Sequence, residues 1–197
     1  MIRALVLCLA CLAIGLCNLT ADTFTPDNVG APFGVQPFAG LGVTGGVSDP
    51  FFSDLSGLPF AGPAIIDVLA GLTAFDDLGD PISTFSVTGV TVTQGVSSFS
   101  PELESFSLSS PVTYTSTLNP LNQVTVNPSD YNVAFTFDSD SSFQYFYTLD
   151  VSGVPDGGFL LYNDVEGASV PEPDLRMALL LAMGAVLGLS RWCRRAA

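Results

Sequence analysis

The chain has 197 residues, and its 19 acidic side chains face only five basic ones and no histidine, for a formal net charge of −14. With 12% charged and 48% apolar residues, the composition excludes a disordered acidic tail and is enough to fill one apolar core. From Asp22 to Val170 there is no Lys, Arg or His but 14 Asp and three Glu, a charge of −17 that excludes a nucleic-acid binder, because phosphate contacts need cations.

The first residues predict a secretory signal peptide over residues 1–21, with a helical apolar segment. Arg3 gives a positive start, residues 4–16 are apolar, and the chain then becomes polar at Asn18. The apolar run is short for a membrane span, which needs about 20 residues. Small residues allow cleavage after Cys17 or after Ala21, and these two sites remain alternatives.

Residues 22–62 are rich in Gly, Pro and Phe and show little periodicity, so they are interpreted as loop with short edge strands. The pattern becomes β from Ala64 onward. The β-branched residues of Ile65–Phe75 favour a strand over a helix. Further along, Phe85 and Val87 share one phase while Val90 and Val92 share the other, which predicts a bulge near Gly89.

Two later segments alternate apolar and polar residues with a period of two. The first has Tyr131, Val133, Phe135 and Phe137 on one face; the second has Phe143, Tyr145, Tyr147, Leu149 and Val151. The Asp- and Ser-rich residues 138–142 between them predict a hairpin connection, and residues 156–158 predict another turn. The expected fold is all-β, an antiparallel β-sandwich or barrel-like exported domain over residues 22–169.

The last residues combine three features in a fixed order. Pro171, Glu172 and Pro173 come first, the apolar run 177–189 follows, and a basic cluster of Arg191, Arg194 and Arg195 ends it. The apolar run predicts a transmembrane helix, and the arginines favour a cytoplasmic C-terminus. The segment is short for a bilayer core of about 30 Å, so thinning of the bilayer or snorkelling of the flanking arginines is needed.

Together with a signal peptide at the other end, these residues resemble the PEP-CTERM sorting signal of bacterial exported proteins. The resemblance covers about residues 170–195, and only that part of the chain. It implies that residues 170–197 hold a precursor in the inner membrane and that an exosortase-type protease cuts near Pro171–Pro173. A single-pass tail anchor that is never cut is the alternative.

The exported part offers little catalytic chemistry. Without His or Lys, a serine nucleophile has no activating base. The remaining option is a pair of carboxylates, as in glycoside hydrolysis, and Glu102 and Glu104 are two residues apart. Their Pro- and Ser-rich surroundings favour a solvated turn, so the protein is expected not to be an enzyme.

Calcium is the one cofactor that the acidic loops suggest. Asp138 and Asp140 have the spacing of the first ligands in a calcium loop, although the later positions of the EF-hand pattern do not match. Residues 76–80 form a second acidic cluster. The alternative for both is Asp in turns, where the carboxylate bonds its own backbone, and this interpretation is preferred.

Two functions remain open. The first is an exported structural or interaction protein of the cell surface or extracellular matrix, associated with biofilm or exopolysaccharide. Its partners would be the inner membrane, an exosortase-type protease, and exopolysaccharide or other surface proteins. The second is a secreted carbohydrate-binding or adhesive module, assisted by calcium, for which Tyr145 and Tyr147 are candidate aromatic contacts despite sharing the phase of the core.

Overall fold

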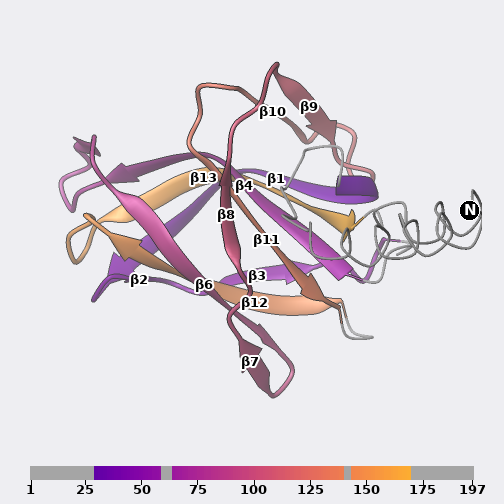
Figure 1. Cartoon of the computed structure of the whole chain (residues 1–197), viewed down its shortest axis with the longest axis horizontal. Coiled ribbons are helices and arrows are strands. Elements are labelled where there is room, and N and C mark those ends of the chain that lie inside the picture. The colour runs from indigo at the N-terminus through magenta and orange to yellow at the C-terminus, as the bar shows by residue number, and fades with distance from the viewer. Residues whose placement is uncertain (1–28, 59–63, 140–142, 170–197) are drawn as a thin grey trace, which may run out of the picture.

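The computed structural model of the protein describes residues 29–58, 64–139 and 143–169, which are coloured in Figure 1. These ranges contain thirteen strands and no helix, which confirms the predicted all-β class for them. The strands are β1 (Val29–Thr44), β2 (Val47–Ser48), β3 (Phe51–Asp54), β4 (Ala64–Phe75), β5 (Pro81–Ile82), β6 (Ser86–Gln94), β7 (Ser97–Phe99), β8 (Leu103–Phe106), β9 (Val112–Thr115), β10 (Gln123–Val126), β11 (Asn132–Asp138), β12 (Gln144–Ser152) and β13 (Phe159–Ser169).

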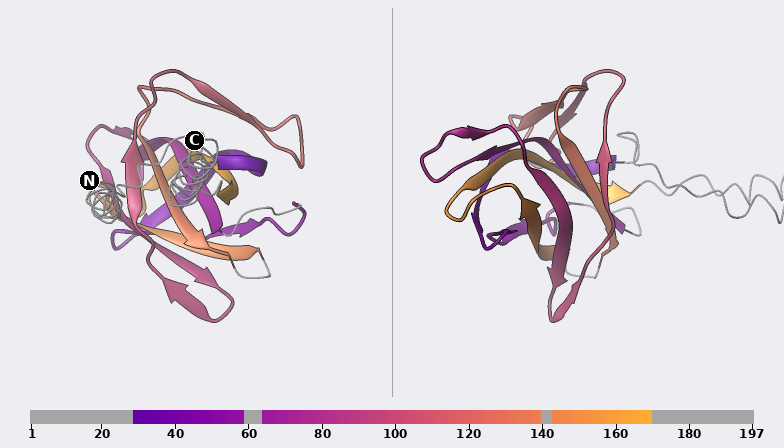
Figure 2. Two further views of the ribbon diagram at one scale, coloured as in Figure 1. Left: turned by 45° about the vertical axis from the view of Figure 1, so that its right-hand side comes forward. Right: turned by 60° about the vertical axis from the view of Figure 1, so that its left-hand side comes forward.

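Eleven of these strands form one antiparallel sheet. Its order is β7-β6-β12-β2-β1-β13-β4-β11-β8, with β3 paired to β12 and β5 paired to β4. The sheet curls on itself into a half-barrel, and β9 and β10 form a separate pair outside it (Figure 1 and Figure 2). The antiparallel, barrel-like part of the prediction is therefore confirmed.

The concave side of the half-barrel holds the main core. Successive side chains of a strand point to opposite faces, so the long strands contribute alternate residues to it. On β11 these are Val133, Phe135 and Phe137, and β12 contributes the set Tyr145, Tyr147, Leu149 and Val151, all of them buried. The predicted phase of both segments is confirmed.

A second, smaller core lies on the convex side. Ile66, Val68 and Ala70 of β4 point outward there and are buried together with Tyr114 and Val124 of the β9–β10 pair. Burial on both faces explains why residues 64–70 form a nearly continuous apolar run with a single acid in it.

The prediction of mostly loop over residues 22–62 is wrong for residues 29–44. These form β1, which lies inside the sheet between β2 and β13. The register with β13 shifts once between Gly30 and Phe33 and once between Gln36 and Ala39. Pro32 and Pro37 lie in these two intervals, so both fall at irregular positions where no ladder donor is required. Phe38 follows with a positive φ of 57° and an exposed side chain.

The predicted hairpin between the two period-two segments is also wrong. β11 pairs with β4 and β8, whereas β12 pairs with β2, β3 and β6. The rings of Phe135 and Tyr147 meet edge to face at 5.4 Å across the core, so the two strands pack against each other through their side chains. Two strands that face a core from opposite sides show the same alternation as a hairpin, and the sequence pattern cannot separate the two.

Two finer predictions are confirmed. The register between β6 and β12 shifts where Thr88 is inserted beside Gly89, and Val87, Val90 and Val92 are buried on both sides of this bulge. Residues 64–75 form β4, a strand as expected.

The predicted signal segment (1–21) and sorting segment (170–197), with the helices expected in them, lie outside the described residues. Within residues 29–58, 64–139 and 143–169, there is no helix with the length and apolar character that a membrane crossing requires. The last described strand, β13, ends at Ser169.

Candidate functional site

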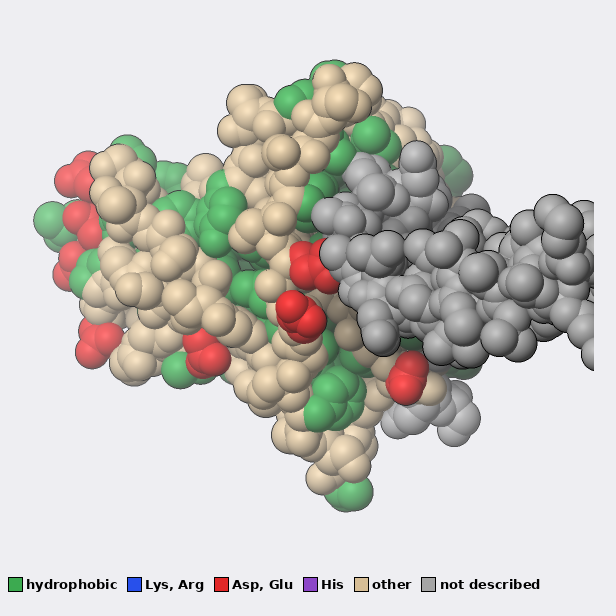
Figure 3. Space-filling model, in the orientation of Figure 1, with side chains coloured by type: hydrophobic (Ala, Val, Ile, Leu, Met, Phe, Trp, Pro, Cys, Tyr) green, Lys and Arg blue, Asp and Glu red, His purple; other side chains and the backbone are tan. Residues whose placement is uncertain are grey.

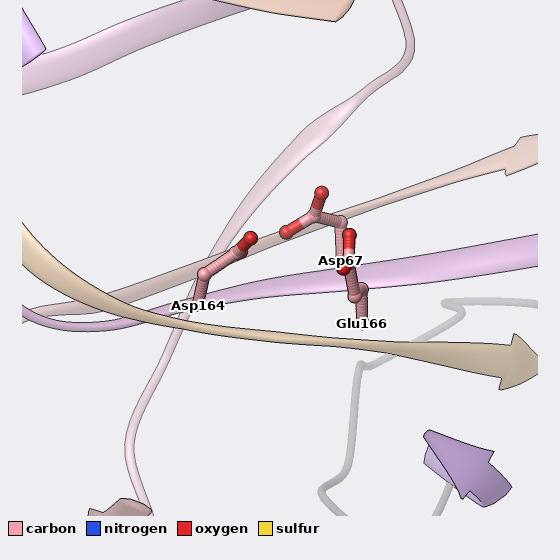
Figure 4. A group of neighbouring side chains, drawn as sticks. All are labelled: Asp67, Asp164 and Glu166. Atoms are coloured by element: carbon pink, nitrogen blue, oxygen red, sulfur yellow. The ribbon is translucent and has the colours of Figure 1, made fainter. Parts of the chain in front are cut away.

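Three carboxylates lie together on two neighbouring strands, in the phase that faces the main core. Asp67 is in β4, and Asp164 and Glu166 are in β13, where Glu166 is the register partner of Asp67. Ile65 and Leu69 share the phase of Asp67 and are buried in the main core. Figure 4 shows the carboxyl group of Asp164 directed toward Asp67, with Glu166 beside Asp67. We call Asp67, Asp164 and Glu166 the interior acidic cluster.

Hydroxyl groups from the opposite half of the sheet contact two members of this cluster. The Tyr145 phenol, on β12, lies 2.7 Å from Oδ2 of Asp67 and 2.8 Å from Oε2 of Glu166. Ser53 of β3, the register partner of Tyr145, donates to the same oxygen of Glu166. Because a phenol has one proton, Tyr145 satisfies one of its two carboxylates at a time.

The other carboxyl oxygens of Asp67 and Asp164 have no hydrogen-bond donor. Oδ1 of Asp67 and both oxygens of Asp164 are buried without a partner, and both side chains have no exposed surface. One oxygen of each of the three carboxylates lies within 4.8 Å of the others. Burying an ionised carboxylate without a partner costs free energy of folding, so the native state requires a proton or a cation that neutralises the charge.

Burial raises the pKa of every carboxyl group in the cluster. Burial raises the pKa of Asp67 to about 7; hydrogen bonding from Asp164, when that residue is protonated, and from Tyr145 opposes the shift, and the Glu166 charge adds to it. Burial, followed by the charges of Asp67 and Glu166, raises the pKa of Asp164 well above its ordinary range. The pKa of Glu166 is also raised by burial, while the hydroxyls of Ser53 and Tyr145 oppose that rise.

Aromatic side chains surround the cluster on the β12 side. The phenols of Tyr147 and Tyr162 bond each other at 2.7 Å, and burial raises the pKa of both well above the ordinary value. Phe137 meets Tyr145 edge to face at 4.9 Å, and Phe51 lies 5.1 Å from Tyr147. These rings make the surroundings apolar, which strengthens charge interactions inside the cluster.

The geometry limits what the cluster can do. Asp67 and Asp164 have no exposed surface and Glu166 is half-buried, so a polymer or metabolite cannot touch the first two in this conformation. A proton or a bare cation is small enough to be held between the three carboxylates. The arrangement therefore supports ion or proton binding, whereas hydrolysis needs room for a substrate between the carboxyl groups.

The residues predicted from the sequence lie elsewhere. Asp138 is exposed at the end of β11, and Asp140 lies outside the described residues, so their calcium site remains a prediction. Glu102 is exposed before β8 and Glu104 lies within it. The sorting residues Pro171, Glu172 and Pro173 and the arginines Arg191, Arg194 and Arg195 also fall outside the described residues.

In the second acidic cluster, residues 76–80, the contacts of Asp76 agree with the interpretation of these acids as turn residues. Its Oδ1 accepts bonds from the backbone N–H groups of Leu78 and Asp80, at 3.0 and 2.8 Å. This carboxylate closes its own loop.

Sequence reasoning missed the interior acidic cluster, although a signal was present. Asp67 is the one acid in an apolar strand, in the phase of Ile65 and Leu69. Asp164 and Glu166 continue the period-two series that begins at Leu160 and Tyr162. An acid in the core phase of a strand marks a buried carboxylate, but only the pairing of β4 with β13 shows that the three acids meet.

Comparison with known proteins finds no matching family, no similar curated protein and no similar solved structure.

Proposed function

We propose that this chain is an exported structural or interaction protein of the cell surface or extracellular matrix, associated with biofilm or exopolysaccharide. Its C-terminal segment anchors the precursor in the inner membrane, and an exosortase-type protease releases the mature form. The observation that carries the proposal is the ordered set at the C-terminus: Pro171–Glu172–Pro173, the apolar run and the arginines, opposite an N-terminal signal peptide.

The position of the last strand supports this proposal. β13 pairs with β1 on one side and β4 on the other, and it ends at Ser169. Cleavage near Pro171–Pro173 would therefore leave every described strand intact.

The surface chemistry supports an interaction role over catalysis or nucleic-acid binding. The described residues contain no Lys, Arg or His, and the face in Figure 3 shows acidic side chains, several of them close together at its left end, among polar and apolar ones. In the interior acidic cluster, Asp67 and Asp164 are closed to a substrate. We accordingly propose a non-enzymatic role.

Mass spectrometry of the protein from cells and from the extracellular fraction tests the proposal. We expect the extracellular form to end near Pro171–Pro173, and peptides containing Arg191 to occur only in the membrane fraction. Replacing Pro171, Glu172 and Pro173 together by Ala should keep the chain in the membrane. Extracellular protein with an intact C-terminus contradicts processing, and wild-type chain found only in the membrane supports the uncut tail anchor.

A secreted carbohydrate-binding or adhesive module is the second candidate, and its aromatic contacts need revision. Tyr145 and Tyr147 are 1% exposed, so they cannot stack on a sugar. Phe52 of β3 and Phe146 of β12 are register partners on the opposite, outer face of these strands. Both are about half exposed, and their ring centroids are 4.8 Å apart. A glycan array with and without chelator tests this role, and loss of binding in the Phe146→Ala variant would favour it.

A further inference from the structure

The interior acidic cluster combines two independent observations. Three carboxylates converge within 4.8 Å, and two of them, Asp67 and Asp164, are fully buried with oxygens that have no donor. Buried polar atoms in native proteins are almost always satisfied, so orphaned oxygens directed at one another point to a missing partner.

No basic side chain of the exported part can be that partner. Residues 22–170 contain no Lys, Arg or His, so a salt bridge within this part of the chain is excluded. The hydroxyl donors at the cluster, Tyr145 and Ser53, are already used on Oδ2 of Asp67 and on Glu166. Backbone N–H groups of β4 and β13 are engaged in the sheet ladder on both sides.

A proton satisfies the cluster only in part. If Asp164 is protonated, it can donate to Asp67, which pairs one oxygen of each residue. The second oxygen of Asp164 still has no donor. A cation placed between the carboxylates accepts electron pairs from all three at once and offsets two of their three negative charges.

The atoms that could act as ligands indicate which cation the cluster would bind. The cluster offers one converging carboxylate oxygen from each of three residues, together with the Tyr145 phenol and the Ser53 hydroxyl, and no sulfur or imidazole. Hard oxygen donors suit Ca²⁺ and Mg²⁺. Ca²⁺ takes six to eight oxygens in flexible geometry, whereas Mg²⁺ requires an octahedron and usually keeps several waters, which a cluster with two fully buried carboxylates does not favour.

We propose that Asp67, Asp164 and Glu166 form a structural Ca²⁺ site inside the half-barrel, with Tyr145 and Ser53 as neighbouring oxygen donors. The ion would join β4 and β13 directly and, through Tyr145 and Ser53, would tie them to β12 and β3. It would thus brace the two halves of the curled sheet, in an exported part that cannot form an internal disulfide, because residues 22–169 contain no cysteine.

Glu166 provides the approach to the site. It is the one half-buried member, and it lies beside Gly34 of β1. A Cβ on residue 34 would lie 3.1 Å from Oε1 of Glu166 and 3.4 Å from the Leu55 side chain. Glycine here leaves the Glu166 carboxylate room to turn toward the cluster.

Calcium titration of the purified full-length chain tests the proposal. The chain is first stripped with EDTA and dialysed, and CaCl₂ is then added at an ionic strength held constant with NaCl. We expect one Ca²⁺ per chain by equilibrium dialysis. The melting temperature should rise by about 5–10 °C once Ca²⁺ exceeds its Kd about 100-fold, and MgCl₂ should give a smaller rise.

Matched variants locate the ion. Asp67→Asn and Asp164→Asn keep the side-chain shape and remove one charged ligand each, so both should abolish the calcium-induced shift. Asp138→Asn, at the exposed loop, should leave it unchanged. Because an Asn variant could fail to fold, Glu166→Gln provides a third test at the half-buried edge of the cluster and should weaken calcium binding at least tenfold.

Three results would overturn the proposal. The first is no bound Ca²⁺ in the wild-type chain at 1 mM, which would mean that protons alone neutralise the cluster. The second is a shift that survives in Asp67→Asn and Asp164→Asn but is lost in Asp138→Asn, which would place calcium at the loop. The third is an equal effect of NaCl and CaCl₂ at matched ionic strength, which would reduce the effect to screening.

Discussion

Asp54 and Asp67 are the same residue type and each interacts electrostatically with Glu166, yet their pKa values move in opposite directions. Asp54 is exposed at the end of β3, where the hydroxyl and backbone N–H of Ser56 and the side-chain amide of Gln144 donate to it and lower its pKa. Asp67 is fully buried with a single phenol donor, and its pKa rises. In a region without basic residues, burial and the supply of donors decide the charge state of a carboxyl group.

The supply of donors depends on the kind of backbone nearby. Exposed turns have free N–H groups, so Asp76 accepts two of them and Asp156 accepts one from Gly45 at 2.7 Å. In the middle of a sheet the N–H groups are already paired along the ladder. Interior carboxylates must therefore rely on hydroxyl groups, protons or a cation.

The largest expected effect is a loss of stability with rising pH in the metal-free chain. The raised pKa of Asp67 means that the folded state binds its proton more tightly than the unfolded state does. Stability from this proton is complete below the unfolded value of 3.8 and is lost as pH rises to about 7. The loss is on the order of 4 kcal/mol for Asp67 alone.

Urea unfolding between pH 4 and 8, in EDTA and 0.5 M NaCl, measures this loss. The salt screens repulsion among the exposed acids, which would otherwise add to the same trend. Stability that increases over this interval would show that the interior acids are ionised at little cost, and the contrast with Asp54 would disappear.

The second effect is a gain of stability on removing one interior charge. At pH 8 in EDTA, Asp164→Asn should raise the free energy of unfolding by about 1–3 kcal/mol, because the amide need not be neutralised when buried. It should also flatten the pH dependence. Urea unfolding of both chains provides the measurement, and a variant less stable than wild type at pH 8 would contradict the buried-charge argument.

The third effect is a difference in stability between variants of Tyr145, which bonds carboxylates, and Tyr147, which bonds another phenol. Tyr145→Phe removes a donor to carboxylates and should cost about 2 kcal/mol at pH 7, whereas Tyr147→Phe removes a neutral phenol pair with Tyr162 and should cost about 1 kcal/mol. Both rings stay in place, so packing is matched. Equal losses in chemical unfolding would mean that the carboxylates gain nothing special from Tyr145.

The smallest effect is expected at Asp54, the exposed member of the compared pair. Asp54→Asn should lower stability slightly at pH 7, since a lowered pKa contributes stability above the unfolded value that is lost as pH falls. The difference should vanish near pH 2 and shrink in high salt. A thermal melt of wild type and variant at both pH values tests it, and a loss as large as that of Tyr145→Phe would mean that solvent does not screen this site.

Local patterns in the sequence determined much of the fold. The period of two along residues 131–137 and 143–151 identified the strands and their buried faces, and the phase change at Gly89 located a bulge. These features depend on residues close in sequence, because alternation along one strand follows from the backbone geometry alone. The composition also shows that side chains of residues 22–170 cannot form salt bridges with one another, because this range has no Lys, Arg or His.

Only the tertiary structure decided which strands are neighbours. The long pairing of β1 with β13 makes a strand of a Pro- and Gly-rich segment that shows no pattern by itself. β11 and β12 follow one another in the chain but face each other across the core, because a buried face looks the same whichever strand lies beside it. The interior acidic cluster exists for the same reason: each acid is visible in its own strand, and the antiparallel register of β4 with β13 brings Asp67, Asp164 and Glu166 together.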